Sequence, residues 1–71
     1  MELLMSKHAL EQARERGVSI NEIRETIQKG AKFPQEEKII AIHRHIKVIF
    51  KKINKTVFVI TVMIRNQEDG K

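Results

Sequence analysis

The sequence of this protein contains no cysteine, no tryptophan and no tyrosine, and its only aromatic residues are three phenylalanines. The absence of cysteine excludes a disulfide framework, a thiolate metal site and a cysteine nucleophile. No apolar run is long enough to cross a bilayer, and no signal-peptide pattern is present. We therefore expect a cytoplasmic protein that does not contact a membrane.

Glycine and proline are scarce, so each one indicates a boundary. Residues 1–5 are apolar and fit either an extended lead-in or the start of a helix. Ser6 is a good N-cap for a helix over residues 7–16. Gly17 is suited to the left-handed position that ends such a helix. The first stretch therefore predicts one short helix.

A second helix is predicted over residues 20–29. Ser19 and Glu22 have the spacing of a capping box at its start. Gly30 would end it, and the only proline follows in residues 31–37, which we interpret as a surface linker.

The rest of the chain is rich in β-branched residues and predicts strands over residues 38–42, 45–51 and 56–65. We expect an odd-length turn with Asn54 or Lys55 in the left-handed conformation. That register gathers one apolar face from Ile46, Val48, Phe50, Phe58, Ile60, Val62 and Ile64. The expected fold class is α+β, with two N-terminal helices packed on one face of a small, three- to four-stranded antiparallel sheet.

The chain has 71 residues, which we divide into a single domain over residues 1–65 and a flexible tail over residues 66–71. Its net charge is +5, of which +4 lies in residues 34–71. A basic β-rich half favours a polyanion such as RNA, or an acidic protein, as partner. The alternative is a solvated charged surface that only keeps the protein soluble.

The stretch over residues 42–51 alternates with a period of two and predicts a cationic, imidazole-bearing face. Cleavage of RNA without a metal needs a base, an acid and cations that hold phosphate. The candidate acids and bases are His8, His43 and His45. The candidate phosphate or nucleic-acid ligands are Arg14, Arg16, Arg44, Lys47, Lys51 and Arg65. The alternative is a solvated strand face with exposed histidines.

Two other site types are less well supported. His43 and His45 would leave the same face of an extended strand, but a zinc site needs a third protein ligand. We therefore expect no metal and no cofactor. The paired helices suggest a helix-turn-helix reader, yet Glu22 at the start of the second helix would repel phosphate.

The last strand is apolar on both faces, which is typical of a central or covered strand. Val57, Val59 and Met63 would form an exposed apolar face in the expected register. Such a face usually marks an interface, so we expect a homodimer or a bound partner segment there.

Several segments together resemble a known family, the small prokaryotic domain of unknown function 4258. They are Ser6-Lys7-His8-Ala9-Leu10-Glu11, Arg14-Glu15-Arg16-Gly17-Val18-Ser19, Glu22-Ile23 and Val57-Phe58-Val59-Ile60-Thr61-Val62. The resemblance covers residues 5–65 and implies two helices followed by an antiparallel sheet, similar to the RelE, ParE and BrnT toxin folds. Positions that match the family are His8, Arg16, Gly17 and Thr61, whereas Gln12 stands where many members carry Arg.

The resemblance implies a toxin-type endoribonuclease of a toxin–antitoxin system, with a small acidic antitoxin-like protein as partner. The alternative is a non-catalytic module that binds RNA or a protein through the basic strand face. His8 also has a structural interpretation, in which it bonds a strand carbonyl and fixes the first helix to the sheet.

Overall fold

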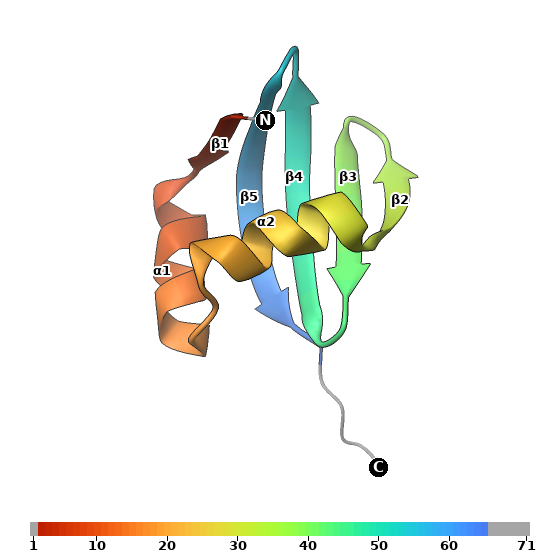
Figure 1. Ribbon diagram of the computed structural model, residues 1–71. Coiled ribbons are helices and arrows are strands. Elements are labelled where there is room, and N and C mark those ends of the chain that lie inside the picture. The colour runs from red at the N-terminus through yellow and green to blue at the C-terminus, as the bar shows by residue number, and fades with distance from the viewer. Residues whose placement is uncertain (1, 66–71) are drawn as a thin grey trace.

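Two helices cover one face of a five-stranded sheet in the computed structural model, which describes residues 2–65 (Figure 1). The predicted tail, residues 66–71, lies outside the described residues. Neither helix of residues 2–65 is long and apolar enough to span a membrane. In chain order the elements are β1 (Glu2–Met5), α1 (Lys7–Arg16), α2 (Ile20–Lys29), β2 (Ala31–Gln35), β3 (Lys38–His43), β4 (Ile46–Ile53) and β5 (Thr56–Ile64).

Both predicted helices are confirmed, because local capping groups define their ends. The Ser6 hydroxyl accepts a hydrogen bond from the Ala9 backbone N–H at 3.0 Å. Gly17 has a φ of 68°, the left-handed conformation that ends α1. Ser19 and Glu22 form the complete capping box of α2. Local sequence is therefore sufficient to specify this half of the fold.

The sheet is mixed and larger than the three- to four-stranded antiparallel sheet predicted from the sequence. Its strand order is β1-β5-β4-β3-β2, and β1 runs parallel to β5. Residues 31–35 form the edge strand β2, so their interpretation as a linker is wrong. Every side chain of β2 is exposed, so this strand lacks the apolar alternation that indicates a strand. Pro34 is tolerated because β2 is an edge strand.

A β-bulge in β5 corrects the predicted register. Ile49 pairs with Thr61, whereas Phe50 pairs with Val59, so Ile60 is the additional residue of β5. The predicted shared face is confirmed for Ile46, Val48, Val62 and Ile64, because Ile46 pairs with Ile64 and Val48 pairs with Val62. Between the bulge and the turn the pairing is shifted, and the turn has two residues instead of an odd number. Asn54 is left-handed, with a φ of 57°.

The bulge decides which side chains of β5 enter the core. Val57, Val59 and Val62 are all buried on the face that the helices cover. Ile60 and Thr61 both lie opposite Ile49 on the other face, because a bulge places two residues against one. The predicted exposed face of Val57, Val59 and Met63 is therefore wrong for its two valines.

Candidate functional site

The sheet face away from the helices is apolar and only partly shielded from solvent. Directly paired residues of antiparallel strands share a face, so the pairing assigns each side chain to one side. Within residues 2–65, no strand side chain on this face is fully buried. We call it the open sheet face, and its large apolar residues are Leu4, Phe33, Ile40, Ile42, Ile49, Ile53, Phe58, Ile60 and Met63.

Exposure on the open sheet face is greatest at the end of β4 and at the two edge strands. Ile53 in β4 is 56% exposed, Phe33 in β2 is 50% exposed and Leu4 in β1 is 49% exposed, while the other large apolar side chains are half-buried. Monomeric soluble proteins rarely leave such a continuous apolar surface on a sheet. The open sheet face therefore has the composition of a binding surface.

Two of the predicted phosphate ligands lie on the open sheet face. Lys47 pairs with Ile42 of β3 and Met63 of β5, and Lys51 pairs with Phe58. The Lys51 ammonium lies 3.6 Å from a carboxylate oxygen of Glu37, in the adjacent turn. Both lysines are half-buried, so their aliphatic stems extend the apolar surface while their ammonium groups add positive charge.

The three histidines are distributed over different surfaces. His43 shares the helix-covered face with its partner Ile46, because the turn at Arg44 and His45 interrupts the strand. The predicted outward face with His43 beside His45 is therefore wrong. The Nε2 atom of His43 is buried and has no hydrogen-bond partner within residues 2–65. His45 is exposed in the turn.

His8 is exposed on the first turn of α1, and its side chain forms no hydrogen bond within residues 2–65. Ser6 takes the role that we considered for His8, because its hydroxyl donates to the Ile60 carbonyl at 3.2 Å. His8 is therefore not the residue that fixes α1 to the sheet.

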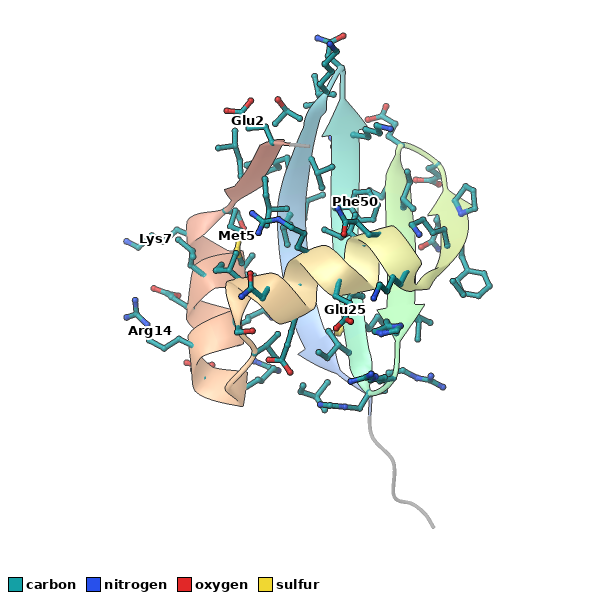
Figure 2. The ribbon with its side chains drawn as sticks, viewed as in Figure 1. Glu2, Met5, Lys7, Arg14, Glu25 and Phe50 are labelled. Carbon is teal, nitrogen blue, oxygen red and sulfur yellow. The ribbon has the colours of Figure 1, made fainter. Side chains whose placement is uncertain are left out.

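The remaining predicted cations divide into two groups. Arg14 points outward from α1, away from the sheet (Figure 2). Arg16, in the last turn of α1, lies 3.7 Å from a carboxylate oxygen of Glu15. The second group lies at the β3–β4 turn, where the Arg65 backbone N–H donates to the His45 carbonyl at 2.7 Å. We call Arg44, His45 and Arg65 the basic turn.

The basic turn acts electrostatically on the start of α2. The Ser19 backbone N–H, which donates to Glu22 at 2.8 Å, is the largest cause that lowers the pKa of the Glu22 carboxyl. The Ser19 hydroxyl lowers this pKa further, and so do the electrostatic interactions of Glu22 with His45 and Arg44. The basic turn therefore places the imidazole of His45 and the guanidinium group of Arg44 near the carboxylate of Glu22.

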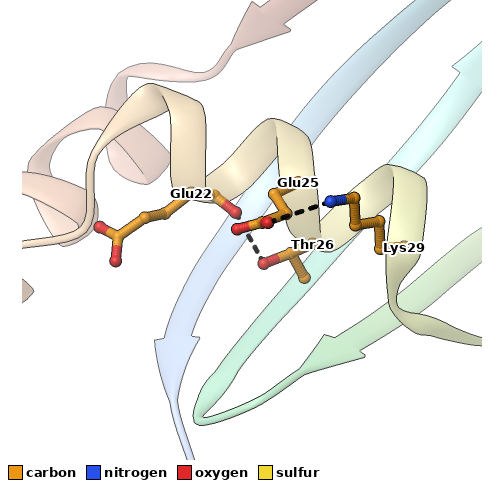
Figure 3. Close-up of polar contacts among 4 residues, drawn as sticks. All are labelled: Glu22, Glu25, Thr26 and Lys29. Atoms are coloured by element: carbon orange, nitrogen blue, oxygen red, sulfur yellow. Dashed lines mark hydrogen bonds and ion pairs between the residues drawn. The ribbon is translucent and has the colours of Figure 1, made fainter.

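Polar side chains of α2, both the buried Thr26 and the solvent-facing Glu25 and Lys29, are satisfied by contacts within the helix. The Thr26 hydroxyl donates to the Glu22 carbonyl at 2.8 Å, and the Lys29 ammonium lies 3.4 Å from the Glu25 carboxylate (Figure 3). Within residues 2–65, no group of three or more His, Asp or Glu side chains is arranged to hold a metal ion.

Sequence reasoning missed much of the open sheet face. It interpreted residues 31–37 as a linker and assigned Phe58 and Ile60 to the helix-covered face, yet Phe33, Phe58 and Ile60 all lie on the open sheet face. A predicted hairpin between β2 and β3 would have assigned Phe33 to this face. The turn of that hairpin is hard to predict, because Glu36 occupies a position where glutamate is unusual. Glu36 has a φ of 58°, a conformation that favours glycine or asparagine.

Comparison with known proteins agrees with the resemblance in the sequence. A family model described as a domain of unknown function (DUF4258) matches residues 5–64. No curated protein and no solved structure matches the chain. Because the family model spans most of the 71 residues, the chain belongs to the DUF4258 family.

Proposed function

We propose that this protein is a non-catalytic interaction module whose open sheet face binds an apolar, acidic segment of a partner protein. The observation that carries this proposal is the continuous apolar surface over β2 to β5, on a sheet whose other face packs against both helices. Protein interfaces have apolar centres with charged groups at selected positions. The open sheet face has this composition.

The charge on β4 supports an acidic partner. Lys47 and Lys51 flank Ile49 on the middle strand of the sheet, so positive charge lies within the apolar surface. The contact of Lys51 with Glu37 joins two partly exposed side chains and contributes little free energy. A carboxylate from a partner can replace Glu37 at low cost, and it gains from the exclusion of water.

The same lysines argue against a second copy of this chain as the partner. In a two-fold dimer the same patch meets itself, so lysines on a middle strand face their own copies. Like charges inside an interface oppose association. An acidic partner avoids this repulsion.

The aliphatic composition favours a protein over single-stranded RNA. Sheets that bind single-stranded RNA stack bases on aromatic side chains. Here the aromatic residues are Phe58 on β5 and Phe33 on β2, with two strands between them. The surface between them is mostly isoleucine, which packs against apolar side chains and does not offer a stacking platform.

A synthetic amphipathic peptide with leucine on one side and glutamate beside it tests this proposal by calorimetric titration. We expect the Lys47→Glu/Lys51→Glu variant to bind the peptide about tenfold more weakly or worse, because two attractions become repulsions. The matched control is Lys7→Glu/Arg14→Glu, which makes the same charge change on α1, where both side chains point away from the sheet (Figure 2). Equal losses in both variants would contradict a specific site.

A second candidate function is a toxin-type endoribonuclease that acts at the basic turn. Its support is that the exposed residues Arg44 and His45 are adjacent in this turn, and that the His45 carbonyl accepts a hydrogen bond from the Arg65 backbone N–H. An imidazole can act as acid or base near neutral pH, and guanidinium groups hold phosphate.

Inducible expression in a bacterial host tests this second candidate, with growth and mRNA integrity followed together. An endoribonuclease would arrest growth and degrade mRNA, and His45→Ala would suppress both effects. His8→Ala is the control, because His8 is also exposed but lies on α1. Intact mRNA with the wild-type chain would remove the endoribonuclease from consideration.

A further inference from the structure

A cavity lies on the helix-covered side of the sheet, opposite the open sheet face. Its volume is about 480 Å³, and it lies between the second half of α2 and the β4–β5 hairpin. In Figure 1 this hairpin extends beyond α2, which crosses the sheet near its middle. Its apolar lining comes from Ile27 of α2 and from three strand residues, Ile39, Phe50 and Val57.

The size and the lining of this cavity are those of a small-molecule site. Such sites enclose about 300–1,000 Å³, with apolar walls and a few polar groups that orient the ligand. Phe50 and Val57 are each only 2% exposed, so they belong to the packed core that forms the floor. A floor that is part of the core remains in place when no ligand is bound.

The charged residues that line the cavity are all lysines: Lys32, Lys52 and Lys55. The Lys32 ammonium donates to the Gly30 carbonyl at 2.8 Å, so it is already held at the end of α2. Lys52 and Lys55 are exposed, and within residues 2–65 their side chains form no hydrogen bond or ion pair. Two uncommitted ammonium groups therefore stand beside an apolar floor.

We propose that this cavity binds a small amphiphilic anion. Its apolar chain or ring would pack on Phe50 and Val57, and its carboxylate or phosphate head would meet the ammonium groups of Lys52 and Lys55. An uncharged ligand would leave both lysines without a partner, and a purely ionic ligand would make no contact with the apolar lining. This inference is independent of the proposed function, because the two sites lie on opposite faces of the sheet.

The probes that test this proposal are octanoate, octyl phosphate and octanol, titrated into isoleucine-methyl-labelled protein. We expect octanoate or octyl phosphate to shift the methyl resonances of Ile27 and Ile39, which line the cavity. Octanol should bind more weakly, because it lacks the charge. Comparison of the two anions shows whether the site prefers a carboxylate or a phosphate.

The variant Lys52→Gln/Lys55→Gln isolates the contribution of the charge. We expect it to bind the preferred anion about three- to tenfold more weakly, as is usual for two partly exposed ion pairs, and to bind octanol as the wild type does. Its unliganded methyl spectrum should match the wild type, because both side chains are exposed. The matched control, Lys47→Gln/Lys51→Gln on the open sheet face, should leave anion binding unchanged.

Three results would overturn the proposal. The first is unshifted Ile27 and Ile39 resonances with all three probes. The second is equal affinity for octanol and for both anions. The third is an equal loss of anion affinity in the two lysine variants, which would indicate a general effect of net charge.

Discussion

The side-chain oxygen of Gln12 accepts a hydrogen bond from the backbone N–H of Val62, at 3.1 Å and across 50 positions of sequence. β1 pairs with β5 only as far as Val59, so the edge of β5 beyond it has no neighbouring strand. The Ser6 hydroxyl donates a hydrogen bond to the Ile60 carbonyl on this edge. Gln12 accepts from the backbone N–H of Val62, which has no strand partner there. Side chains around α1 thus complete the edge of the sheet where β1 ends.

The first prediction concerns this contact. Gln12→Ala should lower the free energy of unfolding by about 1–2 kcal/mol, because the partly buried Val62 N–H loses its acceptor. Gln12→Glu, which keeps an accepting oxygen, should lose less. Urea denaturation measures both variants. Equal stability of Gln12→Ala and the wild type would show that the contact contributes nothing.

The second prediction concerns strain in the β3–β4 turn. Arg44 has a φ of 59°, which is unfavourable for a residue with a side chain. Arg44→Gly should therefore raise the free energy of unfolding by up to about 1 kcal/mol. His45→Gly is the control in the same turn, and it should destabilise the protein because His45 has no positive φ to relieve. Thermal unfolding of the two variants should move in opposite directions, and a parallel change would exclude strain as the cause.

The third prediction concerns pH. The pKa of Glu22 is lowered in the folded protein, first by the Ser19 backbone N–H. A carboxyl with a lowered folded pKa stabilises the protein above its ordinary pKa, and this contribution is lost as pH falls through the folded value. Stability should therefore decline as the pH is lowered through the acidic range.

Glu22→Gln keeps an oxygen that can accept from Ser19 but has no proton to gain. Its free energy of unfolding should depend less on pH than that of the wild type, in urea denaturation between about pH 6 and pH 3, the range around ordinary carboxyl pKa values. If the free energy of unfolding depended on pH equally in both proteins, carboxyl groups other than Glu22 would be responsible for the acid sensitivity.

The fourth prediction concerns self-association. If Lys47 and Lys51 keep the open sheet face from meeting its own copy, then Lys47→Ser/Lys51→Ser should dimerise at lower concentration than the wild type. Light scattering over a concentration series measures the difference. The control variant Lys7→Ser/Arg14→Ser on α1 loses the same charge, and its self-association should match that of the wild type. Equal association in both variants would show that only net charge matters.

The sequence was sufficient to predict α1 and α2 because their ends depend on neighbouring residues. Ser19 and Glu22 contact each other across three positions, so their spacing alone indicates the capping box. The strands depend on distant partners. β1 is too short to show a period, and its place is determined by β5, more than fifty positions away. β2 has only exposed side chains, so it has no apolar pattern.

The candidate site was predicted only in part for the same reason. Lys47, Lys51 and Met63 lie on the face where the sequence placed them, because β4 alternates without interruption and Met63 lies on the far side of the β5 bulge from the turn. Val57 and Val59 lie on the opposite face because the bulge at Ile60 shifts the alternation by one residue. No local pattern indicates that bulge.

The proposed function depends on the open sheet face being the surface that binds an acidic partner. Its most direct test is titration of isoleucine-methyl-labelled protein with the acidic amphipathic peptide. Ile40, Ile42, Ile49 and Ile60 report on the open sheet face, whereas Ile23, Ile27 and Ile46 report on the helix-covered core. We predict saturable shifts in the first set and little change in the second. Unchanged resonances in the first set, or larger shifts in the second, would contradict the proposed binding surface.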